Sequence, residues 1–153
     1  HLRTAMISQK CQYALRAVFE LARQAGQGPV KIGRIAEAQA IPVRFLEAIL
    51  NQLKQGGFVN SRRGQEGGYF LVHDAGKLTV GQVIRFFEGP IGPVGCTDGK
   101  NKPRCPLWGS CVFLGMWERV GQAIAEVYDG TTFTDLLEQE KALTSAGCKI
   151  KSR

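Results

Sequence analysis

Hydrophobic residues recur at helical spacing near the start of the chain. The period over residues 9–25 predicts an amphipathic helix that Ser8 caps and that Gly26 and Gly28 end. Its apolar positions are Ala14, Val18, Leu21, Ala22 and Ala25.

Two shorter helical patterns follow, over residues 32–38 and 42–55, and the dipeptide Ala40-Ile41 forms a turn between them. Pro42 suits the first position of the second helix, because its missing N–H would have no partner there. That helix carries an apolar stripe and ends at Gly56-Gly57. The stripe consists of Phe45, Leu46, Ile49, Leu50 and Leu53. A short helix, a tight turn and a second helix predict a helix-turn-helix.

Two short strands are predicted next, over residues 58–62 and 69–73, with Gly64, Gly67 and Gly68 in the hairpin between them. A helix-turn-helix followed by a hairpin with arginines at its tip predicts a winged helix. Thr79 then caps an amphipathic helix over residues 80–88.

The rest of the chain predicts a loop rich in glycine and proline over residues 89–110 and one long helix over 112–130. The apolar stripe of the long helix is wide, and either a second copy covers it or it packs within the monomer. The stripe consists of Phe113, Met116, Trp117, Val120, Ile124, Val127 and Tyr128. Thr134 can cap a last short helix over 135–143.

These patterns predict a mostly α fold with a small β-hairpin: a winged helix-turn-helix head plus a long C-terminal dimerisation helix. We divide the chain into a DNA-binding domain (6–88), a cysteine-rich loop (89–111), a dimerisation helix with a C-terminal helix (112–143) and a flexible tail (144–153). Met6 is the expected natural start.

Charge changes this picture by suggesting a partner. The 153 residues hold 20 Lys and Arg against 13 Asp and Glu, and the excess lies in the first half of the chain. It indicates either a polyanion partner or a solvated basic face. No apolar run is long enough to cross a bilayer, and no signal peptide is evident, so we expect a cytoplasmic protein.

Three of the five cysteines, Cys96, Cys105 and Cys111, fall within the predicted loop. In a reducing compartment such a group binds metal or does redox chemistry more often than it forms disulfides. The spacing is not that of a zinc knuckle, although a loop of this length can wrap three thiolates around one cluster. An enzyme is not expected, because the sequence has no Ser–His–Asp set, no phosphate-binding loop and only two histidines.

Several segments together resemble a known family, the winged-helix repressors typified by IscR, NsrR and RirA. The matching segments are S-x-K-x-x-Y-A-L-R from Ser8, I-P-V-R-F-L-E from Ile41, S-R-R-G-Q-E-G-G-Y-F-L from Ser61, L-T-V-G-Q-V-I-R-F-F-E-G-P from Leu78, and the three-cysteine loop before a long helix. The resemblance covers about residues 6–141. It implies a homodimer that pairs through its long helix and binds a near-palindromic double-stranded DNA operator.

The DNA-binding residues follow from this architecture. The second helix of the motif would enter the major groove with its N-terminal end toward the bases. That end carries Val43, Arg44 and Glu47; Glu47 either selects a base or pairs with Arg44. Arg62, Arg63 and Gln65 belong to the wing, and Lys10 at the start of the first helix suits a phosphate.

The resemblance also implies an iron–sulfur cluster, 2Fe–2S or 4Fe–4S, on Cys96, Cys105 and Cys111. The loop has no histidine to complete the cluster. The candidates for the fourth ligand are Gln12, at a position where some relatives carry a carboxylate, and Cys11 and Asp98. We hypothesise that a bound cluster orders the loop and thereby sets the spacing of the two heads. Thiol chemistry without metal, or a structural zinc, are the alternatives.

Overall fold

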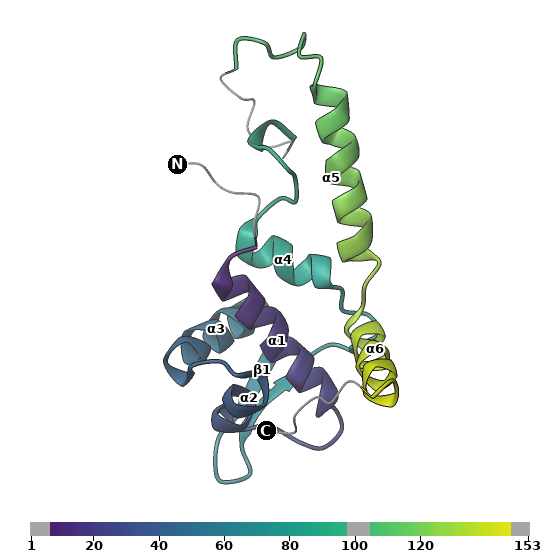
Figure 1. Cartoon of the computed structure of the whole chain (residues 1–153). Helices are drawn as coiled ribbons and strands as arrows, with labels where there is room; N and C mark the ends of the chain where they lie inside the picture. The colour runs from purple at the N-terminus through teal and green to yellow at the C-terminus, as the bar shows by residue number, and fades with distance from the viewer. Residues whose placement is uncertain (1–6, 98–104, 148–153) are drawn as a thin grey trace.

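A computed structural model of the chain describes residues 7–97 and 105–147 (Figure 1). The elements are α1 (Gln9–Arg23), α2 (Ile32–Gln39), α3 (Val43–Gln55), β1 (Val59–Arg62), β2 (Gly68–Leu71), α4 (Val80–Glu88), the 3₁₀ helix η1 (Gly95–Thr97), α5 (Leu114–Asp129) and α6 (Phe133–Ser145). The predicted mostly α fold with one small hairpin is confirmed. No helix in the described ranges is both long and apolar enough to span a bilayer.

The head is built around α1, which packs against α2, α3, α4 and α6. The buried side chains of α1 and α3 follow the predicted periods, except that Phe45 is exposed and that Ala25 is exposed beyond the end of α1. Burying each large aliphatic side chain stabilises the fold by about 1.5–3 kcal/mol. The core centres on Val18, Leu21, Ile35, Leu46, Ile49, Leu50, Leu53, Val59, Leu78, Val83 and Phe133.

Side-chain caps define where several helices begin. Ser8 caps α1 by accepting from the Cys11 amide, as predicted, and Thr79 forms a capping box with Gln82 at the start of α4. Pro42 precedes α3 instead of being its first residue, a shift of one position that is common at helix ends.

The cap predicted for the last helix is wrong. Thr132, not Thr134, caps α6, because its hydroxyl accepts from the Asp135 amide while the Asp135 carboxylate accepts from the Thr132 amide. The helix therefore begins at Phe133, whose side chain is fully buried in the core of the head.

The hairpin is shorter than predicted but keeps the expected pairing. β1 and β2 are antiparallel, with Val59 opposite Leu71 and Arg62 opposite Gly68. An isolated bridge between Val30 and Tyr69 adds a third backbone segment beside β2.

The chain leaves the head after α4 and returns through α5 (Figure 1). Of the segment between them, η1 packs against α5. Gly121 of α5 faces Pro93 of this segment. Helix α6 then packs against α1, so α5 forms an arm whose C-terminal end rejoins the head.

Candidate nucleic-acid interface and cysteine loop

The turn between α2 and α3 fixes the direction of the second helix. Ala40 adopts a left-handed conformation with φ 51°, and the amide of buried Ile41 donates to the Ala36 carbonyl at 3.0 Å. The predicted helix-turn-helix is thus formed by a tight, hydrogen-bonded corner.

The inner side of α3 is anchored, which leaves its other side to solvent. Leu46, Leu50 and Leu53 are buried beneath the helix. At the N-terminal end, Val43, Arg44 and Glu47 are all exposed. These are the three side chains predicted to face base edges. An exposed valine beside two charged side chains suits the major groove, where base edges present both hydrogen-bonding groups and the thymine methyl group.

Aromatic contacts hold Arg44. Its guanidinium carbon lies 4.6 Å from the ring centroid of Phe45, which is in turn stacked on Tyr13 at 6.4 Å. The alternative in which Glu47 pairs with Arg44 is not found, since none of the salt bridges in residues 7–97 and 105–147 joins them. Both charges are available to a partner.

The hairpin connection depends on glycine. Gly64 has φ +102°, and a Cβ at Gly67 would lie 2.1 Å from the Arg62 carbonyl oxygen. Arg63 and Gln65 are exposed within this connection. The wing therefore carries a cation and an amide on a tight, glycine-dependent turn.

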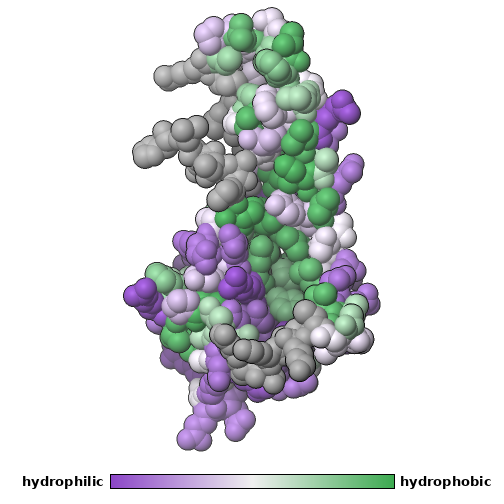
Figure 2. Space-filling model, in the orientation of Figure 1, coloured by the Kyte–Doolittle hydropathy of each residue, from purple (hydrophilic) through white to green (hydrophobic). Residues whose placement is uncertain are grey.

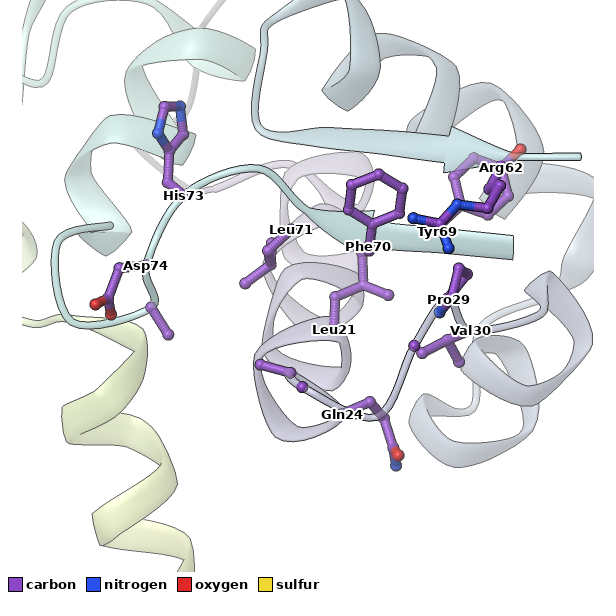
Figure 3. A pocket seen from close by; sticks show the side chains of 14 residues that line it. Leu21, Gln24, Pro29, Val30, Arg62, Tyr69, Phe70, Leu71, His73 and Asp74 are labelled. Carbon is purple, nitrogen blue, oxygen red and sulfur yellow. The ribbon is translucent and has the colours of Figure 1, made fainter. Parts of the chain in front are cut away.

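Arg62 is held differently from its neighbour Arg63. Its guanidinium carbon lies 5.7 Å from the Phe70 ring centroid, and the side chain lines a cavity beside β2 (Figure 3).

Two lysines that the sequence analysis did not single out join the hairpin to the helices. Lys31, just before α2, donates to the Gly64 carbonyl at 3.0 Å. Lys54 of α3 donates to the Ser61 hydroxyl at 2.8 Å. Their place in the basic half of the chain was the available signal, but only the fold shows what they contact.

A carboxylate occupies the start of α1. The Ser8 amide donates to Glu88 at 3.0 Å, and the Ser8 hydroxyl is also bonded to Glu88. Lys10 is exposed nearby in the sequence. Because Glu88 already holds the anion position at this helix end, a phosphate would have to use the Lys10 side chain.

The three loop cysteines are free thiols, with Cys96 and Cys111 partly buried and Cys105 exposed. Cys96 lies in η1, and Cys111 lies just before α5. Thiolates are the donors that iron–sulfur clusters and zinc use. Within the ranges that the structure describes, no three potential ligands are gathered as a metal site. Asp98 lies outside the described residues.

The other two candidate ligands differ in accessibility. Cys11 is fully buried, and burial, followed by the Glu88 charge, raises the pKa of its thiol to about 12. A thiolate ligand is therefore unfavourable there. Gln12 is exposed, and its amide nitrogen donates to the Ile7 carbonyl at 3.0 Å.

The apolar stripe of the arm stays largely uncovered in the monomer. Figure 2 shows hydrophobic surface along this part of the molecule. Trp117, Ile124 and Tyr128 are partly buried. The exposed apolar residues are Val112, Phe113, Met116, Val120 and Val127. Packing within the monomer therefore does not account for the stripe.

The C-terminal end of the arm is fixed to the head. Arg85 of α4 donates to both carboxylate oxygens of Asp129, one of them at 2.7 Å, and the Val80 amide donates to the Thr131 carbonyl at 2.9 Å. This clamp is not predicted from the sequence, although Gly81 inside a helix is a signal of close approach by another group.

Comparison with known proteins agrees with this architecture. Residues 7–139 match the family model described as "Rrf2: Iron-dependent Transcriptional regulator". The HTH-type transcriptional regulator CymR of Bacillus subtilis is 35% identical over 130 residues, which cover 85% of this chain and 88% of CymR.

Two solved structures are also similar. T. potens IscR superposes with TM-score 0.71 at 33% identity, covering 88% of each chain. CymR (YrzC), the global cysteine regulator of B. subtilis, superposes with TM-score 0.71 at 34% identity, covering 88% of this chain and 97% of that one. These relatives are regulators, not enzymes, and they confirm the resemblance drawn from the sequence motifs.

Proposed function

Because the chain belongs to the Rrf2 family of transcriptional regulators, we propose that it is a homodimeric repressor that binds a specific operator under the control of an iron–sulfur cluster. The observation that carries the DNA-binding part is the exposed N-terminal end of α3, presented by a buried inner face next to a basic wing.

In this proposal, α3 enters the major groove and reads bases through three side chains. Arg44 donates to a guanine or a phosphate, Glu47 accepts from a cytosine amino group, and Val43 contacts a thymine methyl. Arg63 and Gln65 of the wing reach a flanking minor groove or phosphate, and Arg62 joins them when it leaves Phe70. Lys10 adds a phosphate contact that fixes the register.

The arm supplies the dimer interface. A second copy would cover the exposed face that includes Phe113, Met116 and Val120, because a two-fold interface buries the same patch on both subunits. Each arm is clamped to its own head through Arg85 and Asp129, so pairing of the arms would set the distance between the two copies of α3.

The loop would hold the cluster through Cys96, Cys105 and Cys111, with Gln12 favoured over Cys11 and with Asp98 as the further candidate. A bound cluster supplies sensitivity to iron supply, oxidation and nitric oxide. The loop begins after Glu88, which bonds the start of α1, and it ends where α5 begins. Ordering this segment therefore acts on both the DNA-contacting head and the free end of the arm.

Anaerobic purification with iron and sulfide analysis tests the cluster directly. Operator affinity is then compared between the cluster-loaded protein and the same protein stripped of iron. We expect the two forms to differ by tenfold or more, as typical coupling energies allow. Equal affinities would contradict control by the cluster, while loss of operator binding in both forms would contradict the DNA-binding proposal.

A regulator of the same fold that works through thiols or zinc is the second candidate. Two observations favour it. In residues 7–97 and 105–147, no three potential metal ligands lie close enough together to form a metal site. The chain is also similar to CymR, a cysteine regulator. Colour separates the two, because an iron–sulfur protein is brown whereas thiol and zinc forms are colourless.

A further inference from the structure

A cavity of about 480 Å³ lies between the C-terminal turn of α1 and the strand β2 (Figure 3). We call it the β2-edge cavity. Leu21 of α1 and Gln24, just after that helix, line it on one side, while Tyr69 and Leu71 line it from the strand. Its volume falls in the range of pockets that bind small molecules.

Among residues 7–97 and 105–147, the edge of the strand beside the cavity is paired only at Tyr69, which bonds Val30. The Val72 amide donates to Phe58 of the neighbouring segment at 3.1 Å, whereas Tyr69 exchanges two bonds of 2.8 Å with Val30 on the opposite edge. Backbone groups alternate in direction along a strand, so the N–H and C=O of Leu71 point to the same edge as those of Tyr69. Leu71 is therefore the residue whose backbone faces the cavity.

The geometry also limits what can pair with this edge. A segment antiparallel to β2 that bonds Leu71 would run toward the place that Val30 already occupies beside Tyr69. The chain before Val30 does not fill the gap, because Gly28 has φ +87° and lines the cavity. An added antiparallel segment must end at this point.

A cation lies near the end of the edge that Val30 blocks. The side chain of Arg62 reaches across β2, and its guanidinium lies between Phe70 and Pro29 in Figure 3. Among the salt bridges of residues 7–97 and 105–147, none involves Arg62. A guanidinium at the place where an added peptide strand must end favours a C-terminal carboxylate there and disfavours an amino terminus.

We propose that the β2-edge cavity binds the C-terminal end of an extended peptide from a partner protein. The last residues of that peptide pair with Leu71 antiparallel to β2, and the terminal carboxylate accepts from Arg62. This combines strand addition at a sheet edge with capture of a chain terminus. Pro29 and Leu71, which both line the cavity and are only partly buried, provide apolar surface for one peptide side chain. The site does not include the proposed base-reading residues of α3, but it shares Arg62 with the proposed DNA contacts of the wing.

Two synthetic peptides test the proposal on the full chain: acetyl-Ala-Leu-Ala with a free carboxylate, and the same peptide as its C-terminal amide. Affinities are measured by calorimetry for wild type, Arg62→Ala and Arg63→Ala. In wild type we expect the acid to bind about tenfold more tightly than the amide, as a charge-assisted hydrogen bond implies. Arg62→Ala should lose this preference, and Arg63→Ala, which removes the same charge one residue away, should keep it.

Hydrogen exchange supplies a second measurement that does not depend on a substitution. The Leu71 amide should become protected when the acid peptide is added to wild type. The proposal is overturned if wild type binds neither peptide at millimolar concentration, if it binds acid and amide equally, or if the preference survives in Arg62→Ala. Equal binding of acetyl-alanine and the acid tripeptide would also overturn it, because the strand pairing would then contribute nothing. None of these results depends on operator binding.

Discussion

Gly81 and Asp129 approach so closely that any side chain at position 81 would displace the Asp129 carboxylate: a Cβ there would lie 2.0 Å from Oδ1 of Asp129. Gly81 is buried in α4, and Arg85, one turn later, holds the same carboxylate. The Asp129 carboxylate, which packs against Gly81 and bonds Arg85, thus helps to fix the C-terminal end of the arm to the head.

The first prediction is that Gly81→Ala has opposite effects in two backgrounds. In wild type it should lower the free energy of unfolding by about 1–3 kcal/mol, because the new methyl group displaces Asp129. In Asp129→Ala the obstruction is gone, and alanine should stabilise α4 by up to about 1 kcal/mol relative to glycine. Urea unfolding of wild type, the two single variants and the double variant measures this double-mutant cycle. Additive effects of the two substitutions would contradict the predicted contact.

The second prediction concerns pH. The hydrogen bond from Arg85, together with its charge, lowers the pKa of Asp129. A carboxylate with a lowered pKa contributes stability above its ordinary pKa of about 4, and it loses that contribution as pH falls through the folded value. Asp129→Asn should therefore cost about 0.5–1 kcal/mol at neutral pH, as expected for an exposed pair, and almost nothing at about pH 2.

Urea unfolding at both pH values checks this dependence. Glu126→Gln removes a carboxylate from the same helix and should show no such difference between the two pH values. A cost for Asp129→Asn that persists in acid would mean that the ion pair is not its origin.

The third prediction separates phosphate contact from general charge. Arg63→Ala should weaken operator binding similarly for all sequences and reduce the log–log salt slope by about 0.9, which is the loss of one phosphate contact. Lys77→Ala removes an equal charge from the exposed turn before α4 and should leave the slope unchanged. Binding isotherms at several salt concentrations measure both variants; identical slopes for the two would refute the contact.

The fourth prediction distinguishes Cys11 from the loop cysteines. Burial that raises the Cys11 pKa to about 12 keeps this thiol protonated at pH 8. Cys11 should react with a thiol reagent only after unfolding, whereas Cys105 should react in the native protein without iron. Mass spectrometry of the labelled peptides locates the modified residues.

The same difference should appear in iron content. Cys11→Ala should keep its iron after anaerobic purification, while Cys96→Ala and Cys111→Ala should lose it. Loss of iron from Cys11→Ala with an intact fold would make Cys11 a ligand after all.

The fifth prediction concerns a buried carboxylate. Glu20 of α1 is 1% exposed, and it accepts from Gln39 of α2 at 2.9 Å and pairs with Arg23, which also bonds Glu140 of α6. Glu20→Ala should lower the free energy of unfolding by about 2–4 kcal/mol, because the partners lose a buried acceptor. Glu138→Ala on the exposed side of α6 should change it by less than about 0.5 kcal/mol. Thermal or urea unfolding measures both variants. Similar losses of unfolding free energy in Glu20→Ala and Glu138→Ala would mean that the network around Glu20 does not stabilise the fold.

Local elements of this protein could be read from the sequence because they depend on neighbours a few residues apart. The Ser8 and Thr79 caps, the helical periods of α1 and α3, and the glycine-dependent hairpin each involve short-range contacts. Even there, the cap at Thr132 was missed, since the burial of Phe133 that draws this residue into the helix comes from the distant head.

The sequence by itself determined the order of the elements, the winged helix-turn-helix and the grouping of three cysteines before a long amphipathic helix. Only the tertiary structure decided that α6 returns to α1, that Glu88 occupies the start of α1, that Arg62 turns back along the hairpin onto Phe70, and that Asp129 rests on Gly81. The reason is physical: spacing along the chain fixes helices and turns, whereas contacts between residues tens of positions apart exist only after the core has closed around α1.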